Sequence, residues 1–196
     1  MLLPFIAWAV TGVFFFFKPG YNEAYQPLLI EKYPLKQAAK KSILNIALPV
    51  NNEDWLEVRQ LRTILGEHLL VKNSKGWQHL SPKTFIEREQ PEQQEINLLV
   101  NDAIKNNKSR YGDIKAIDKL VITTTTDVRI TLNWQNMTLR QQGVDTDFIN
   151  TIYNVHYLRW TGIKALDQVL GVVGLMLVLL LAGIGVWMTF KQRKAK

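Results

Sequence analysis

Three histidines, His68, His79 and His156, are the residues with the most versatile chemistry in this chain. A neutral imidazole can act as a general base near physiological pH or bind a metal ion. His68 and His79 flank the strands of a hairpin predicted by the turn residues at 73–76, so the two side chains can meet across it. We expect both to be exposed, and exposed strand histidines are more often inert than metal-binding, so we predict no metal site at this pair.

His156 lies in a different setting, shortly before the apolar C-terminal part of the chain. We expect Tyr153, Tyr157 and Trp160 to form with it an aromatic belt at a membrane interface, where amphipathic rings concentrate. The alternative is that His156 binds haem iron as one of two axial ligands, because a neutral imidazole is a good iron ligand.

Several other kinds of chemistry are excluded by the residues present. The chain has no cysteine, which rules out disulfides, thiolate metal sites and a cysteine nucleophile. No nucleophile elbow, His-Glu-x-x-His motif or phosphate-binding glycine loop occurs. Asp145 and Asp147 are spaced as in a calcium loop, but a helix start explains both, since the glycine and distal glutamate of an EF-hand are missing. We therefore predict no catalytic residues, and favour a binding protein over an enzyme.

Two apolar segments indicate that the chain is held in a membrane. Residues 169–190 carry no charge and, as a helix, span about 33 Å, slightly more than the hydrocarbon core of a bilayer. The basic tail at 191–196 places the C-terminus in the cytoplasm by the positive-inside rule. Residues 1–17 form a shorter apolar run of about 25 Å. The alternatives are a first membrane span and a cleaved secretory signal peptide, and we favour the span because the run lacks the basic n-region and the cleavage site of a signal peptide.

These segments predict a domain organisation of transmembrane helix 1 at 1–17, an extracytoplasmic domain at 18–167, transmembrane helix 2 at 168–190 and the tail. A span that begins at Met1 without a polar flank suggests that the natural helix extends further upstream. All 17 acidic residues precede residue 168, and charges of both signs alternate in the domain, so the net charge of +7 does not indicate nucleic-acid binding. The expected partners are membrane lipid and a protein.

Within the domain, the patterns predict a helix lying over an antiparallel sheet. Pro91 opens a helix whose apolar residues recur at helical spacing. Strands are expected at 120–126, 127–134 and 137–142, and a separate hairpin pairs 69–72 with 77–80. Residues 56–66 fit a helix or a strand equally well. The fold class is therefore α+β, anchored by two flanking transmembrane helices.

The approach to the last span is predicted to be an amphipathic helix at about 145–160, leading from the sheet to the membrane surface. Glycines in the two spans permit close helix approach. We expect Gly12 to pack the first span against Gly171 or Gly174 of the second.

The chain resembles PepSY-domain membrane proteins of Gram-negative bacteria over nearly its whole length. The resemblance is carried by Trp8–Gly12, Phe16–Tyr21, Arg110–Gly112 and Tyr153–Gly162, which precede a glycine-containing span. It is a pattern of aromatic, glycine and proline positions. The resemblance implies a two-pass inner-membrane protein with cytoplasmic termini and a periplasmic PepSY-like helix-and-sheet domain.

The same resemblance suggests two functions. Soluble PepSY modules in metallopeptidase propeptides act as inhibitory or folding modules, which favours a non-catalytic accessory module that presents its domain to a protein partner. Larger multi-span relatives are linked to siderophore-iron reduction, with histidines in or near the spans as proposed haem ligands. The alternative is therefore a haem-binding redox subunit in which His156 binds haem b; the first interpretation needs no cofactor.

Overall fold

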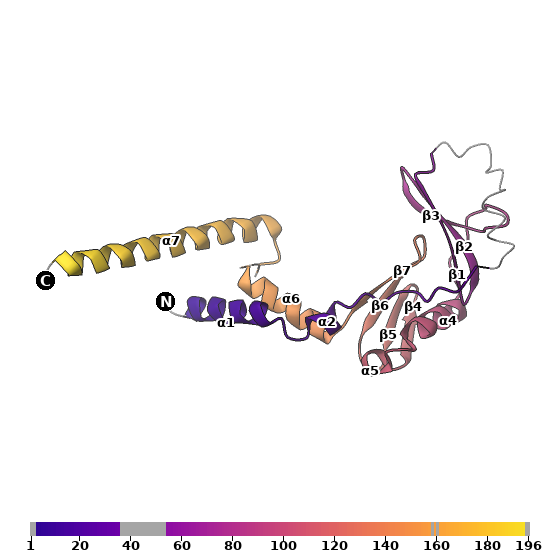
Figure 1. Ribbon diagram of the computed structural model, residues 1–196, viewed down its shortest axis with the longest axis horizontal. Coiled ribbons are helices and arrows are strands. Elements are labelled where there is room, and N and C mark those ends of the chain that lie inside the picture. Colours follow the sequence, from indigo (N-terminus) through magenta and orange to yellow (C-terminus); the bar gives the residue numbers. More distant parts are fainter. Residues whose placement is uncertain (1–2, 36–53, 158, 160, 195–196) are drawn as a thin grey trace. The chain divides into compact units, whose positions relative to one another are not determined.

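The helix expected after Pro91 is present as α4 (Gln93–Ile104), and its start is locally determined. The amide of Glu92 donates a hydrogen bond to Oε2 of Glu95 at 3.1 Å. This bond satisfies one of the backbone N–H groups that have no partner within the helix at its start. The computed structural model describes residues 3–35, 54–157, 159 and 161–194 (Figure 1). These form two compact units, Asn22–Val144 and Met1–Tyr21 with Asp145–Lys196.

In the first of these units, α4 packs on a four-stranded antiparallel sheet. Its strands are β4 (Ile114–Asp118), β5 (Val121–Thr124), β6 (Arg129–Asn133) and β7 (Thr138–Gln142), in the order β4-β5-β6-β7. Side chains alternate along β6, where buried residues separate exposed ones. The buried face meets α4 in a core that contains Ile96, Leu99, Val100, Ile104, Ile122, Ile130, Leu132 and Trp134. The predicted helix over an antiparallel sheet is confirmed.

Strand β4 was not anticipated from the sequence. Its apolar residues Ile114 and Ile117 are three positions apart, which is not strand spacing. A register irregularity between Ile114 and Ala116 accounts for this, since an extra residue there returns both isoleucines to the packed face. A short helix, α5 (Lys108–Tyr111), leads into the strand.

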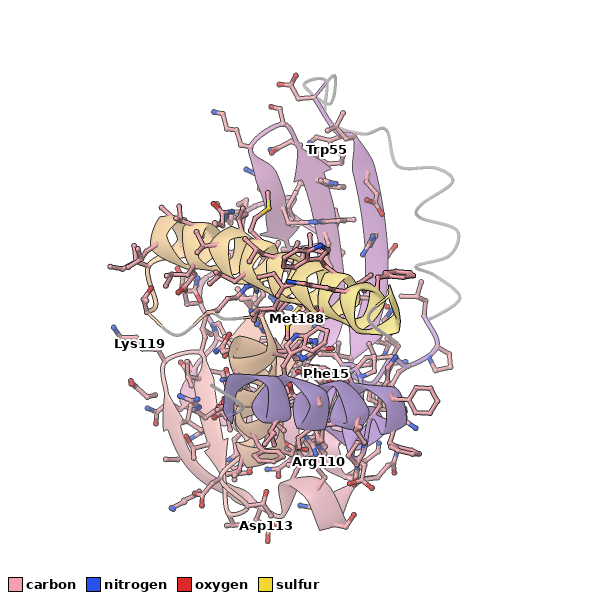
Figure 2. The ribbon with its side chains drawn as sticks, turned by 90° about the vertical axis from the view of Figure 1, so that its left-hand side faces the viewer. Phe15, Trp55, Arg110, Asp113, Lys119 and Met188 are labelled. Atoms are coloured by element: carbon pink, nitrogen blue, oxygen red, sulfur yellow. The ribbon has the colours of Figure 1, made fainter. Side chains whose placement is uncertain are left out.

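A second antiparallel sheet consists of β1 (Glu57–Thr63), β2 (Gly66–Asn73) and β3 (Gly76–Leu80). The predicted hairpin of β2 and β3 is confirmed. Within the ambiguous stretch at 56–66, Glu57–Thr63 form a strand that pairs with β2 along its whole length, residues 64–65 are a turn, and Gly66 begins β2. The central strand is buried on both faces, which is why its apolar residues run consecutively rather than alternating. Leu70 joins the main core, whereas Leu69 and Val71 pack against Trp55 and Phe85 on the opposite face. Figure 2 labels Trp55 beside this sheet.

The other unit contains α1 (Leu3–Phe17), α6 (Val144–His156) and α7 (Lys164–Lys194). The short α2 (Tyr21–Ala24) begins at Tyr21, where the first segment of this unit ends. Residues Lys164–Met188 of α7 are long and apolar enough to cross a membrane. In the described part of α1, the apolar stretch Trp8–Phe17 is shorter than a span, so a second transmembrane helix stays a prediction.

The helix expected at about 145–160 ends at His156, four residues early. Tyr157 is a turn, and Gly162 has a φ of 74°, a left-handed conformation that a helix cannot continue. The chain then restarts as α7 from Lys164. The amphipathic helix and the apolar helix are therefore separate elements.

Candidate functional site

The two strand histidines form a buried pair. Nδ1 of His68 lies 2.9 Å from Nε2 of His79, and the side chains are 0% and 1% exposed. The expectation that these histidines are exposed is therefore wrong. Their strands could be recognised from the sequence, but which face of the sheet becomes buried depends on the packing of the rest of the domain.

The sheet register places the pair on the face that meets the main core. His68 lies opposite Leu61 on β1, and His79 lies opposite Leu70 on β2. Residues directly opposite each other in an antiparallel sheet share a face. Since Leu61 and Leu70 both pack into the main core, the two imidazoles project into the same interior.

The donors and acceptors around His68 determine its tautomer. Nη1 of Arg88 lies 2.7 Å from Nδ1 of His68, and a guanidinium can only donate, so Nδ1 must be unprotonated. Nε2 then carries the hydrogen and donates to Oγ1 of Thr63 at 2.8 Å. The contact between the two imidazoles determines the tautomer of His79 as well, because Nε2 of His79 must donate to the unprotonated Nδ1 of His68.

Trp134, which follows β6, covers the pair from the four-stranded sheet. Its ring centroid is 4.3 Å from that of His79 and 6.0 Å from that of His68. The guanidinium carbon of Arg88 lies 5.7 Å from the centroid of the same indole, and the indole Nε1 donates to the carbonyl of Glu89 at 2.9 Å. The cluster of Thr63, His68, His79, Arg88 and Trp134, called here the histidine cluster, thus joins the two sheets.

Burial keeps both imidazoles neutral. It lowers the pKa of His68 from 6.5 to about 3, and the positive charge of Arg88 and the neighbouring His79 add to this effect. Burial and then Arg88 lower the pKa of His79 to about 4, while the Trp134 backbone acts in the opposite direction. Nδ1 of His79 is buried without a well-formed hydrogen bond among the described residues.

This geometry is unsuited to metal binding or to general base catalysis. Both nitrogens of His68 are engaged by Arg88, His79 and Thr63, and a guanidinium beside the pair would repel a cation. No cluster of three or more metal-binding side chains occurs in the described ranges. The histidine cluster therefore has the character of a polar connection between sheets.

His156 occupies the other unit, where it contacts α1. Its ring stacks on Trp8 with centroids 5.4 Å apart and an interplanar angle of 4°, and its Nδ1 lies 2.9 Å from Oγ1 of Thr11. The Thr11 hydroxyl also donates to the carbonyl of Trp8 at 3.0 Å. Nδ1 of His156 is then the donor to Thr11, which assigns the lone pair to Nε2.

The predicted belt residues take part in the same contact between helices. Tyr153 packs against Phe15 of α1, with centroids 4.4 Å apart, and stacks on Tyr157 at 5.9 Å. Figure 2 labels Phe15 on its helix. Trp160 lies outside the described residues. Whether this aromatic face meets lipid stays a prediction.

Gly12 and Gly171, two of the glycines proposed to pack the spans, differ in their surroundings. A Cβ on Gly12 would lie 3.9 Å from Cε1 of His156, so this glycine faces α6. A Cβ on Gly171 would meet nothing within 4 Å. The packing of Gly12 against Gly171 or Gly174 stays a prediction.

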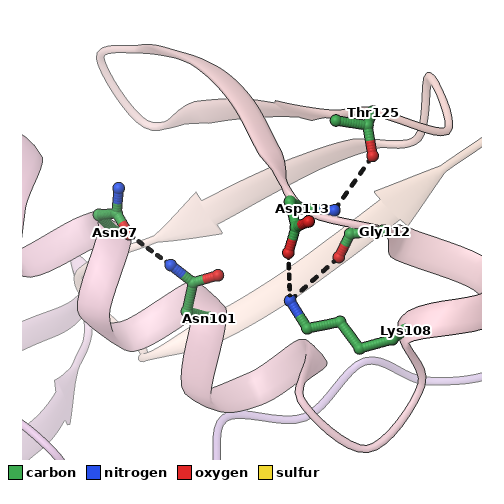
Figure 3. A network of polar contacts seen from close by, with 6 residues as sticks. All are labelled: Asn97, Asn101, Lys108, Gly112, Asp113 and Thr125. Atoms are coloured by element: carbon green, nitrogen blue, oxygen red, sulfur yellow. Dashed lines mark hydrogen bonds and ion pairs between the residues drawn. The ribbon is translucent and has the colours of Figure 1, made fainter.

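Arg110–Gly112, one of the segments that carries the family resemblance, has a structural role (Figure 3). Nζ of Lys108 donates to the carbonyl of Gly112 at 3.2 Å and to Oδ1 of Asp113 at 2.7 Å. The amide of Asp113 donates to Oγ1 of Thr125 at 3.1 Å. Figure 3 also shows a hydrogen bond between Asn101 and Asn97 on α4. The contacts of Lys108 attach α5 to the start of β4, whereas the bond between Asn97 and Asn101 lies within α4.

A further candidate site, the outer edge of β1, was not located from the sequence. The two-residue turn between Thr63 and Gly66 closes on a hydrogen-bonded pair, so the odd-numbered residues of β1 bond to β2. The even-numbered residues direct their main-chain groups away from β2. Consistent with this, the carbonyl of Arg62 accepts a hydrogen bond from the amide of Tyr33 at 2.8 Å.

The other two even-numbered residues of this strand are Val58 and Gln60. In the parts of the chain that the structure describes, no main-chain hydrogen bond reaches their outward groups. Val58 is 47% exposed, and Leu56 beside it is 71% exposed. Val58–Gln60, called here the open edge, is a place where an extended peptide can add as a strand.

Comparisons of the chain with models of known protein families, with curated proteins and with solved structures find no match.

Proposed function

We propose that this chain is a non-catalytic binding module of the bacterial inner membrane, whose PepSY-like domain receives an extended segment of a protein partner on the open edge. The observation that carries the proposal is the outward main chain of Val58 and Gln60. A peptide that adds here gains main-chain hydrogen bonds, while its side chains meet the exposed Leu56 and Val58.

The character of the histidines supports binding rather than catalysis. A general base must be accessible and must titrate near the working pH. His68 and His79 are buried, and burial lowers the pKa of His68 to about 3 and the pKa of His79 to about 4. The groups with the most versatile chemistry in this domain are thus committed to the contact between its sheets.

For the membrane arrangement, we propose a two-pass chain with both termini in the cytoplasm and the domain in the periplasm. The apolar length of α7 and the basic residues that end it support one span. The apolar residues of α1 support the other. Because the chain lacks cysteine, Lys75→Cys and Lys196→Cys provide single reporters. In intact spheroplasts an impermeant maleimide should label only Lys75→Cys, and the opposite pattern would contradict the proposal.

Site-specific photo-crosslinking tests the open edge. A benzophenone amino acid at Val58 should give a discrete adduct in cells, whereas one at Arg129, exposed on the other sheet, should not. Gln60→Pro removes an outward N–H without breaking the ladder to β2, and should abolish the Val58 adduct. Gln60→Val keeps the N–H and should retain it. A Val58 adduct that survives Gln60→Pro would exclude pairing at this edge.

A haem-binding redox subunit is the second candidate, and one observation favours it. The hydrogen bond to Thr11 leaves the lone pair of His156 on Nε2, the form that binds iron. His68 and His79 are buried in the other unit, so we propose that the second histidine ligand comes from a partner chain or from residues upstream of Met1. Haem bound at His156 would give the membrane-purified protein a Soret band and a reducible b-type spectrum, both lost in His156→Ala. A colourless preparation would count against this candidate.

A further inference from the structure

We infer that the histidine cluster is an acid-sensitive latch, which holds the three-stranded sheet against the four-stranded sheet at neutral pH and releases it on acidification. The cluster is placed for this role because His68 and His79 come from β2 and β3, whereas Trp134 follows β6. The centroid distance of 4.3 Å between His79 and Trp134 is a direct contact between the two sheets.

Protonation of His68 conflicts with the geometry of the cluster. Nδ1 of His68 accepts from Arg88 at 2.7 Å and from His79 at 2.9 Å, and it is the acceptor on which both contacts depend. A hydrogen on Nδ1 would face two other donors at these distances. One proton therefore disrupts two hydrogen bonds and adds a positive charge beside a guanidinium.

His79 offers a first position for a proton. Its Nδ1 is buried and has no well-formed hydrogen bond among the described residues, so protonation there breaks none. The cost is a buried charge close to Arg88. Acidification should thus act on His79 before His68, in agreement with the pKa values of about 4 and about 3.

The surrounding charges do not offset this cost. Arg88 is the charged side chain that contacts the pair, and among the described residues neither imidazole forms an ion pair with a carboxylate. The other charged side chains on the three strands and on the segment after β3 make no hydrogen bond to either ring: Glu57, Arg59, Arg62, Glu67, Lys72, Lys75, Lys83, Glu87 and Glu89. Of these, Glu57, Arg59 and Lys72 share the face of the pair. Arg59 and Lys72 lie over Trp77, and Glu57 pairs with Arg59 at 2.7 Å.

The direction of the pH effect follows from linkage. Once released, the histidines regain an ordinary pKa of 6.5, so the open form binds more protons than the closed form at acidic pH. Below that pH, each histidine makes opening about tenfold easier for every unit by which the pH falls, until the lowered pKa is reached. Above pH 6.5, the latch stays closed.

Hydrogen exchange of the full chain in detergent micelles tests the latch. After correction for intrinsic exchange rates, β2 and β3 should lose about a hundredfold in protection per pH unit between pH 6 and pH 4.5, with both histidines acting. Strands β5 and β6 should lose less. Equal protection of β2 and β3 at pH 7 and pH 4.5, or an equal loss in all strands, would overturn the inference.

Substitutions separate the latch from general acid unfolding. His79→Gln keeps a donor near the position of Nε2 but cannot take up a proton, so the pH response should fall to about tenfold per unit. His156→Gln is the matched control, because it removes a histidine in the other unit and should leave the response unchanged. An unchanged response in His79→Gln would contradict the latch.

A measurement without substitutions guards against a variant that fails to fold. In the histidine NMR spectrum of the unmodified chain, the imidazoles of His68 and His79 should stay neutral at pH 5. Titration of His68 or His79 near 6.5 in the folded protein would overturn the inference. Release of a bound partner at low pH would rest on the proposed function, whereas these two measurements need no partner and report on the latch alone.

Discussion

Oγ1 of Thr11 lies 2.9 Å from Nδ1 of His156, which is 145 residues further along the chain. The hydrogen bond lies within an aromatic contact between α1 and α6, in which the rings of Trp8 and Phe15 pack against the imidazole of His156. In an apolar setting a single hydrogen bond orients a ring that stacking alone would leave free to flip. The first helix therefore determines which nitrogen of His156 is available.

Replacement of Thr11 should loosen this contact. Thr11→Val keeps the shape of the side chain but removes the acceptor, leaving Nδ1 of His156 without its partner, at a cost of about 1 kcal/mol. We expect a lower thermal midpoint for the aromatic near-UV circular dichroism of the detergent-solubilised chain. Thr11→Ser retains the hydroxyl and should stay close to the unmodified protein. Equal midpoints for Thr11→Val and the unmodified chain would show that the bond contributes nothing.

Gly112→Ala should destabilise the domain at the junction of α5 and β4. Gly112 has a φ of 60°, and an added Cβ would lie 2.2 Å from Oγ1 of Thr125. Thr125 cannot rotate away freely because this oxygen accepts the amide of Asp113. We expect a loss of about 1–3 kcal/mol in the free energy of unfolding, measured by urea titration.

A double substitution separates the steric and backbone parts of that loss. Thr125→Ala removes the clashing oxygen, so Gly112→Ala should cost less in the Thr125→Ala background than in the unmodified chain. The strain of a positive φ should persist in both. Strictly additive effects would contradict the contact.

Tyr33→Phe should weaken the attachment of the segment before β1 to α4. The Tyr33 hydroxyl donates to Oδ1 of the buried Asp102 at 2.8 Å, and Nζ of Lys105 donates to the same oxygen at 2.9 Å. Loss of one donor to a buried carboxylate should cost about 1–2 kcal/mol in chemical denaturation. In an Asp102→Asn background the same change should cost less, and an identical cost in both backgrounds would rule out this bond as the cause.

Arg88→Met should raise the pKa of both buried histidines, because the guanidinium charge lowers each of them. The sign of the effect on stability follows. A folded pKa below 6.5 gives stability that is present above that pH and is lost as the pH falls, at ~1.4 kcal/mol per unit for each histidine. Raising the folded pKa shortens the pH range of that loss.

The measurement is an NMR titration of the histidines alongside unfolding at several pH values. Lys83→Met, on the exposed part of the same segment, removes a positive charge that does not contact the pair and serves as control. Unchanged histidine titration in Arg88→Met would show that the guanidinium does not act on the pair.

Local patterns predicted much of the α+β domain. The alternation along β6 and the helical spacing in α4 can be recognised from the sequence because each element buries one face and exposes the other. The sequence was uninformative at 56–66, where the pattern fits helix and strand alike. Pairing with the buried β2 decides for a strand. Likewise β4 was missed, because the irregularity between Ile114 and Ala116 disguises its period.

The candidate sites depended more strongly on tertiary structure. The sequence by itself determined that three histidines exist, that His68 and His79 flank the turn of one hairpin, and that a long apolar helix follows His156. Only the fold decided that the strand pair is buried, since a strand's periodicity does not say what packs on each face. Arg88 and Trp134 reach the pair from other segments, and such contacts between distant residues leave no local signal in the chain.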